Sequence, residues 1–160
     1  MSGRLLILRG APALSGFRIE KLLARIATME PAVTSLVSHF VHFASLAHPL
    51  GDGELRILQQ LLTYGPRAAA PRSEDQSDDP RGAAERLLVV PRAGTISPWS
   101  SKATDIARVC GLAAVERIER GIEYRIAARE PLGPQRLLQL APALLDRMTE
   151  MALLDAAEAG

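Results

Sequence analysis

Hydrophobic and polar positions in the first half of the chain alternate between strand-like and helix-like patterns. A short apolar run at 5–8 is typical of a buried strand, and Ser15 is placed to cap the helix that follows. The inner face of that helix is predicted by the i, i+3, i+4, i+7 spacing of Ile19, Leu22, Leu23 and Ile26. Segment 33–46 is rich in β-branched and aromatic residues and predicts a long strand. Asp52 is expected to cap a second helix, which Gly65 ends.

The second half shows the same order of patterns. The apolar run 87–90 predicts a strand, and Ser100 or Ser101 is expected to cap the next helix, with Gly111 at its C-terminal end. The spacing predicts that the inner face of this helix is formed by Ala103, Ile106, Ala107 and Cys110. Strict alternation within 115–128 predicts a strand with one wet face. A closing helix is expected to bury Leu137, Ala141, Leu144, Leu145 and Met148.

Two successive strand-helix-strand-helix patterns predict an α+β fold made of a duplicated unit. We expect pseudo-repeats at 4–65 and 86–148, joined by a mobile, acidic, proline-containing loop at 66–85. Each unit alone has one apolar sheet face, so the two bury more by sharing an antiparallel or mixed sheet packed with helices. The domain is predicted to span 1–148, and the alanine-rich, acidic segment 149–160 to begin a linker. A chance likeness of two αβ patterns is the alternative.

Composition and charge narrow the classes of function. With 160 residues and a net charge of +1, the chain offers no basic surplus that would favour nucleic acid or an anionic membrane as a partner. One cysteine excludes an intrachain disulfide and fits a cytoplasmic protein. Cys110 is predicted to be a buried structural thiol and not a nucleophile. His39 and His42 point to opposite faces of one strand, so no metal pair is predicted and no catalytic constellation is found.

The segment 91–107 is the most informative motif. It combines a strand exit, a Pro/Gly loop and a helix start rich in hydroxyl groups, whose free N–H groups suit an anion. Lys102 adds a charge and can pair with Asp105, but helix capping explains the serines equally well and the glycine spacing of a P-loop is absent. The candidate residues for an interdomain or substrate-border loop are Arg92, Thr95, Ser97, Trp99, Ser100, Ser101, Lys102, Thr104 and Asp105.

Five ordered segments resemble the start of large-type phosphoribosylformylglycinamidine synthases. The longest is Gly94 to Ala107, GTISPWSSKATDIA, and the resemblance extends over most of 5–148. Ala11 and Ala93 depart from the family pattern, where serine and proline are typical. The other segments are LRGAPALSGFR at 8–18, VHFASL at 41–46, YGP at 64–66 and ERGIEY at 119–124.

The resemblance implies a role in purine biosynthesis. The full enzyme is an ATP-dependent C–N ligase that takes ammonia from glutamine to convert formylglycinamide ribonucleotide to its amidine. ATP and Mg²⁺ belong to its synthetase domain, and the nucleophilic cysteine to its glutaminase domain. The N-terminal domain resembles a fused dimer of the small PurS subunit, without cofactor or catalytic residues, and its implied role is to dock those two domains and help shape the ammonia route.

Two alternatives stay open at this point. In one, Arg92, Ser100, Ser101 and Lys102 contribute contacts to the phosphate of the ribonucleotide at the border with the synthetase domain. In the other, the chain is a free-standing PurS-like adaptor that acts in trans. The composition of the segment at 150–160 favours a piece of a longer chain over the adaptor.

Overall fold

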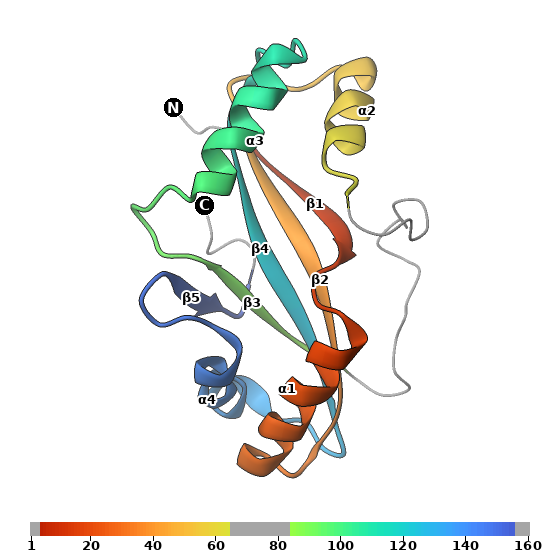
Figure 1. The fold of residues 1–160 in the computed structure, drawn as a ribbon, viewed down its shortest axis with the longest axis vertical. Helices are drawn as coiled ribbons and strands as arrows, with labels where there is room; N and C mark the ends of the chain where they lie inside the picture. Colours follow the sequence, from red (N-terminus) through yellow and green to blue (C-terminus); the bar gives the residue numbers. More distant parts are fainter. Residues whose placement is uncertain (1–3, 65–83, 156–160) are drawn as a thin grey trace.

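The computed structural model describes residues 4–64 and 84–155. In chain order its strands and helices are β1 (Arg4–Pro12), α1 (Gly16–Met29), β2 (Val33–Leu46), α2 (Asp52–Leu61), β3 (Glu85–Pro91), α3 (Pro98–Val109), β4 (Val115–Ala128), α4 (Gly133–Leu144) and β5 (Glu150–Leu153). The strands form one five-stranded sheet in the order β1-β2-β4-β3-β5, and each neighbouring pair is antiparallel (Figure 1). The predicted α+β class is confirmed, and the open choice between an antiparallel and a mixed sheet is decided for the antiparallel form.

The two central strands carry the repeat. β2 and β4 are 14 residues each and pair along nearly their whole length, with Phe40 opposite Ile122 near the middle. Each strand brings one outer strand of its own half, β1 beside β2 and β3 beside β4. The two halves are therefore related by an approximate two-fold axis through the central pair, which is the geometry that the predicted duplication requires.

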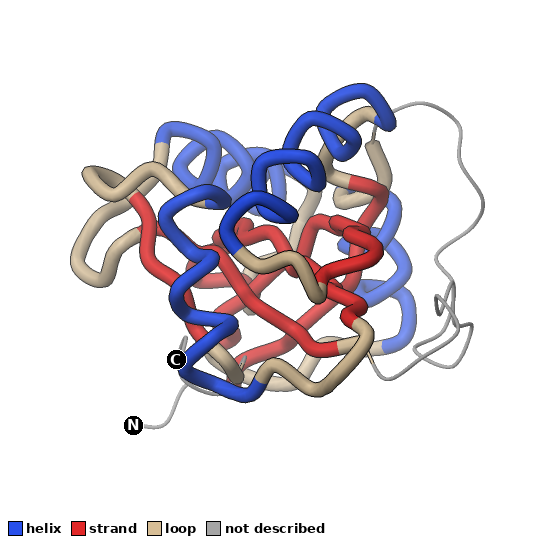
Figure 2. Tube along the Cα trace, turned by 90° about the horizontal axis from the view of Figure 1, so that it is seen from below, coloured by secondary structure: helices blue, strands red, loops and turns tan. Residues whose placement is uncertain are grey.

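All four helices lie on one face of the sheet, in two groups. We call the first group the α1–α4 end, where Leu36, Ile126 and Leu140 belong to one apolar cluster. We call the second group the α2–α3 end, where Leu58 and Ala107 close over the opposite ends of the central strands. Seen from below, the strands form one twisted layer with the helices outside it (Figure 2). Burying these helix faces provides the main apolar stabilisation.

The opposite face of the sheet holds a smaller apolar cluster. Its buried members are Val41, Phe43, Leu88, Val90 and Leu153, with Met151 packed beside them. Leu153 and Met151 lie on β5, which pairs with β3 from Leu88 to Pro91. Residues 150–153 are thus part of the sheet, so the predicted start of a linker at 149 is wrong for them. Backbone pairing with β3 orders a segment whose small, acidic composition gave no strand signal.

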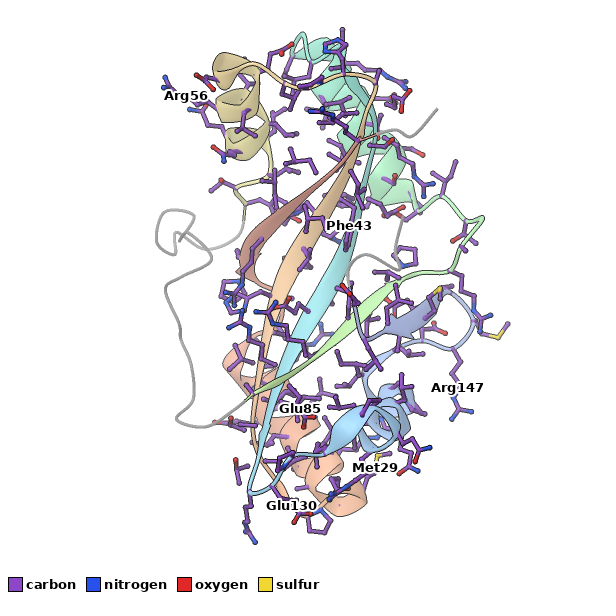
Figure 3. All side chains as sticks on the ribbon, turned by 180° about the vertical axis from the view of Figure 1, so that it is seen from behind. Met29, Phe43, Arg56, Glu85, Glu130 and Arg147 are labelled. Atoms are coloured by element: carbon purple, nitrogen blue, oxygen red, sulfur yellow. The ribbon has the colours of Figure 1, made fainter. Side chains whose placement is uncertain are left out.

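Helix ends follow local chemistry. Ser15 caps α1 as predicted, but α2 begins after Gly51, whose N–H donates to Glu54 Oε2 at 2.8 Å, so Asp52 is the first helical residue and not the cap. Helix α4 is capped from outside, because both Glu85 carboxylate oxygens accept backbone N–H groups, from Leu132 at 2.8 Å and from Gly133 at 3.0 Å. The start of β3 is thereby tied to the start of α4, as Figure 3 shows near the Glu85 label.

Some boundary predictions meet the limits of the described residues. Most of the predicted loop at 66–85 and the helix stop at Gly65 lie outside them, although Glu85 itself is the first residue of β3. Met148, expected on the buried side of the last helix, is 84% exposed because α4 ends at Leu144. Within the described residues, none of the helices is both long and apolar enough to span a membrane.

Candidate functional site

The candidate loop between β3 and α3 is fixed to its surroundings at both ends. Arg92 donates from Nε (3.1 Å) and Nη2 (2.5 Å) to the carbonyl oxygen of Arg147, in the turn before β5. Thr95 Oγ1 donates to the Arg92 carbonyl at 2.6 Å, and Arg117 Nη2 donates to the Thr95 carbonyl at 2.9 Å. Gly94 has a φ of 80°, which glycine adopts without strain. The loop is therefore held in one conformation by neighbours from β4 and the α4–β5 turn.

Helix α3 begins three to four residues earlier than predicted. Its N-cap is Ser97, whose Oγ accepts from the N–H of Ser100 at 3.0 Å and donates to Glu119 Oε1 at 2.8 Å. Pro98 occupies the first helical position, where its lack of an N–H costs nothing. The expectation that Ser100 or Ser101 caps the helix is therefore wrong.

Ser100 and Thr104 attach α3 to the sheet through buried hydroxyl groups. Ser100 Oγ donates to the carbonyl of Ile118 at 2.5 Å, and Thr104 Oγ1 donates to the Ser100 carbonyl at 2.7 Å while accepting from the N–H of Ile118 at 3.0 Å. Ser100 is 0% exposed and Thr104 is 6% exposed. These two candidate residues act inside the domain, because their hydrogen-bonding groups are engaged by backbone atoms of β4.

Three further candidates face outward. Ser101, Lys102 and Asp105 are exposed, and Asp105 pairs with Arg108 at 3.9 Å and not with Lys102. An exposed pair of this kind is worth under about 1 kcal/mol. Ile96, in the loop itself, is 65% exposed, which is unusual for a large apolar side chain in a fixed loop. The outer surface of the loop and of the first turns of α3 thus combines an apolar side chain, a hydroxyl group and a cation.

Trp99 points away from that outer surface into a cluster that sequence spacing does not indicate. Its ring lies 5.7 Å from the ring of His42 and 6.3 Å from that of Tyr64, and the Arg120 guanidinium lies 4.6 Å from the Trp99 centroid. Phe40 adds a further ring, 4.5 Å from Arg120. We call these five side chains the Arg120 cluster. They come from β2, β4, α3 and the segment after α2, so their meeting depends on strand register.

His42 is a neutral member of this cluster. The ring is 1% exposed, and burial together with the charge of Arg120 lowers the His42 pKa to about 4. Its Nε2 lies 2.5 Å from Tyr64 Oη, which accepts from Arg120 Nη1 at 3.3 Å. The Tyr64 hydroxyl therefore bridges the imidazole and the guanidinium. Burial also raises the pKa of Tyr64, so the hydroxyl stays protonated at neutral pH.

Cys110 lies on the surface, which corrects the prediction of a buried thiol. Helix α3 buries Ser100, Thr104 and Ala107, so Cys110 falls on the solvent side.

Within residues 4–64 and 84–155 no group of three or more metal-ligating side chains comes together. His39, on the other face of β2 from His42, lies 2.9 Å from Arg9 Nη2 through its Nδ1.

The fold and the loop define the class of the domain. It is a duplicated α+β domain with one antiparallel sheet, consistent with a PurS-like arrangement, and it carries a fixed loop before α3. Residues 39–160 match the model of the family described as formylglycinamide ribonucleotide amidotransferase N-terminal. The chain belongs to this family, and it is thus the N-terminal part of a formylglycinamidine synthase of purine biosynthesis. The resemblance seen in the loop and strand motifs is confirmed.

Proposed function

We propose that this domain is a non-catalytic assembly domain of the synthase, which docks the synthetase and glutaminase domains and helps shape the route of ammonia between them. In this proposal, ATP, Mg²⁺ and the ribonucleotide bind to the synthetase domain, glutamine is hydrolysed in the glutaminase domain, and the enzyme works in the cytoplasm. Family membership supports the setting. The geometry of the β3–α3 loop supports the docking role.

The main support for the proposal is that some residues of the loop and of α3 hold the backbone in place, while Ile96 is left exposed. Ser97, Ser100 and Thr104 are engaged with β4, and Arg92 with the turn before β5, so they hold the backbone. Ile96 is 65% exposed and belongs to none of the apolar clusters of the described residues. An apolar side chain on a pre-ordered loop binds a partner with little loss of conformational entropy.

Pull-down with a separately purified synthetase domain tests the docking role. We expect Ile96→Asp to weaken the association by about tenfold or more, as for an interface side chain that contributes at least 1.4 kcal/mol. Met29→Asp is the matched control, because Met29 is 47% exposed on α1 at the far end of the domain. The domain alone is expected to show neither glutaminase nor amidine-forming activity. A folded domain that fails to bind the synthetase domain would contradict the proposal.

A contact with the ribonucleotide phosphate is the second candidate function, and it now rests on fewer residues. The buried hydroxyl of Ser100 donates to a carbonyl of β4, and Arg92 donates to the carbonyl of Arg147. Ser101 and Lys102, in contrast, are exposed near the start of α3. Lys102→Ala in the complete synthase separates the two roles. A raised KM for the ribonucleotide with intact assembly favours the phosphate contact, and weakened assembly favours docking. A domain that restores activity when added in trans to the other domains would favour the adaptor.

A further inference from the structure

Arg120 is a half-buried cation that aromatic rings hold in place. Its guanidinium carbon lies 4.5 Å from the Phe40 centroid, 4.6 Å from the Trp99 centroid and 5.8 Å from the Tyr64 centroid. Cation–π contacts of this kind attract the guanidinium to the ring faces and restrict its orientation. The hydrogen bond from Nη1 to Tyr64 Oη adds one polar anchor. The side chain is thus ordered before any ligand arrives.

Arg120 has no carboxylate partner among the described residues, unlike comparable arginines of the chain. Arg117 pairs with Glu119 at 3.0 Å, Arg125 with Glu123 at 3.1 Å and Arg136 with Glu30 at 2.6 Å. The nearest carboxylate in sequence, Glu119, accepts from Arg117 and from the Ser97 hydroxyl. A cation withdrawn from bulk water without a counter-ion is uncommon, because its charge is only partly compensated by ring faces and a hydroxyl oxygen.

One edge of the Arg120 guanidinium remains free. Nη1 is engaged with Tyr64, whereas Nε and Nη2 have no hydrogen-bond partner within the described chain. Neither nitrogen is fully buried, and the residue as a whole is half-buried. Two parallel N–H groups in one plane match the two oxygens of a carboxylate.

Arg136 shows how such an edge is used in this same domain. Its Nε donates to Glu30 Oε2 at 3.0 Å and its Nη2 to Glu30 Oε1 at 2.6 Å, while Nη1 reaches Glu130 at 2.9 Å. In Arg120, Nη1 donates to Tyr64 where the Nη1 of Arg136 donates to Glu130. The Nε–Nη2 edge, which binds the carboxylate of Glu30 in Arg136, therefore has no carboxylate partner in Arg120 among the described residues.

Arg120 lies near the middle of the central strand pair, between the two groups of helices. The residue pairs with His42, next to the central Phe40–Ile122 pair, on the face that carries the helices. Figure 1 shows the α1–α4 end and the α2–α3 end as separate groups, with the middle of the strands between them. His42 is neutral, so the charge of the cluster is that of Arg120 alone.

We propose that the Nε–Nη2 edge of Arg120, framed by Phe40, Trp99 and Tyr64, is a binding site for a carboxylate group. The carboxylate comes either from a small organic acid or from an acidic side chain of an adjoining protein segment. This site does not depend on the docking role proposed for Ile96, which lies on the outer surface of the loop.

Fluorescence titration with sodium acetate tests the site directly. Trp99 is the only tryptophan of the chain and contacts Arg120, so its emission reports on the cluster. At constant ionic strength, set with sodium chloride, we expect a saturable change in the wild-type protein and at least a tenfold weaker response in Arg120→Lys, since lysine keeps the charge but loses the paired N–H edge. Arg86→Lys, an exposed arginine on β3, is the matched control and is expected to respond like the wild type.

The second part of the experiment measures how strongly the wild type and both variants bind the purified synthetase domain. Acetate binding in the isolated domain supports the site and indicates a free organic acid as a sufficient ligand. No acetate response, together with at least tenfold weaker association for Arg120→Lys and unchanged association for Arg86→Lys, supports an acidic side chain as the source. The absence of both effects, in variants whose unfolding midpoints match the wild type, overturns the proposal. A response that chloride reproduces at equal concentration also overturns it.

Discussion

The α1–α4 end and the α2–α3 end occupy equivalent places in the repeat but bury different chemistry. At the first end, Tyr124 packs into an apolar cluster opposite Ser38, whose hydroxyl accepts a backbone N–H at 3.3 Å. At the second end, the equivalent pair is His42 and Arg120, surrounded by aromatic rings. The pairing of the two central strands is shared, so these two pairs of positions differ in the side chains that they carry. One end is therefore stabilised by apolar packing, whereas the other holds the charge of Arg120 among aromatic rings.

Backbone geometry at the α2–α3 end is adapted to the polar cluster. A β-carbon on Gly10 of β1 would lie 2.7 Å from His42 Cε1, closer than such contacts are found. Glycine at this position lets β1 pass over the imidazole ring while still pairing with β2. The Leu8–Arg18 motif that includes Gly10 therefore has a physical role in the cluster, beyond forming an edge strand.

The largest expected effect is a loss of stability at the α1–α4 end. Ile126 is 0% exposed in the cluster between the sheet, α1 and α4, so Ile126→Ala is expected to lower the free energy of unfolding by about 2–5 kcal/mol through lost transfer energy and a residual cavity. Urea unfolding monitored by circular dichroism measures it. Val109→Ala is the control, because Val109 is 88% exposed and is expected to stay within about 0.5 kcal/mol of wild type. A similar loss in both variants would contradict the assignment of this end as the core.

The next effect is a dependence of stability on pH that arises at the α2–α3 end. The His42 pKa is about 4 in the folded protein, below its ordinary value of 6.5, so the unfolded chain binds a proton first as the pH falls. Stability is therefore fully present above pH 6.5 and declines by up to about 3 kcal/mol as the pH drops towards 4. Unfolding free energies measured from pH 7.5 to 4 test this against His42→Gln, which is expected to show a shallower slope. Equal slopes in the two proteins would rule out His42 as the origin.

The smallest effect compares the two N-cap serines, which hold the same place in the repeat. Ser97 caps α3 at 3.0 Å and also donates to Glu119, whereas Ser15 caps α1 with an exposed bond of 3.4 Å. We expect Ser97→Ala to cost about 1–2 kcal/mol and Ser15→Ala less than about 1 kcal/mol. Thermal unfolding of both variants measures the difference. The reverse order would show that the bond to Glu119 contributes nothing.

The sequence predicted the central strands well because their signal is local. Both 33–46 and 115–128 were bounded correctly from β-branched residues and from alternation, and the pairing of the two then follows from the repeat. Helix α1 was equally clear, since its N-cap serine and its apolar spacing agree on the same face.

Helix α3 shows why an apolar pattern alone fails. The spacing of Ile106 and Cys110 suggested an inner face, yet the buried side carries Ser100 and Thr104, whose hydroxyl groups bond to β4. A buried hydroxyl group that finds a backbone partner competes well with an apolar side chain. The prediction missed strand β5 for another reason. The strand forms because it pairs with β3, and its own composition does not indicate a strand.

The Arg120 cluster could not be predicted from the sequence, because it depends on how the strands are aligned. Alternation places Phe40 and His42 on one face of a strand, but only the register of β2 against β4 places Arg120 beside them. Trp99 lies in the first turn of α3 and Tyr64 follows the end of α2, and the orientation of both depends on tertiary packing. The ERGIEY motif that contains Arg120 helped to identify the family, while its charge gave no sign of ring contacts.

The approximate two-fold relation between β2 and β4 has a consequence for the symmetry of single residues. In an assembly of two identical subunits, an arginine at the position of Arg120 would appear twice, once at each end of the sheet. On a single polypeptide the copy of that position is Ser38, which is free to change independently. The two equivalent positions therefore carry different side chains, a serine beside the apolar α1–α4 cluster and an arginine in the Arg120 cluster.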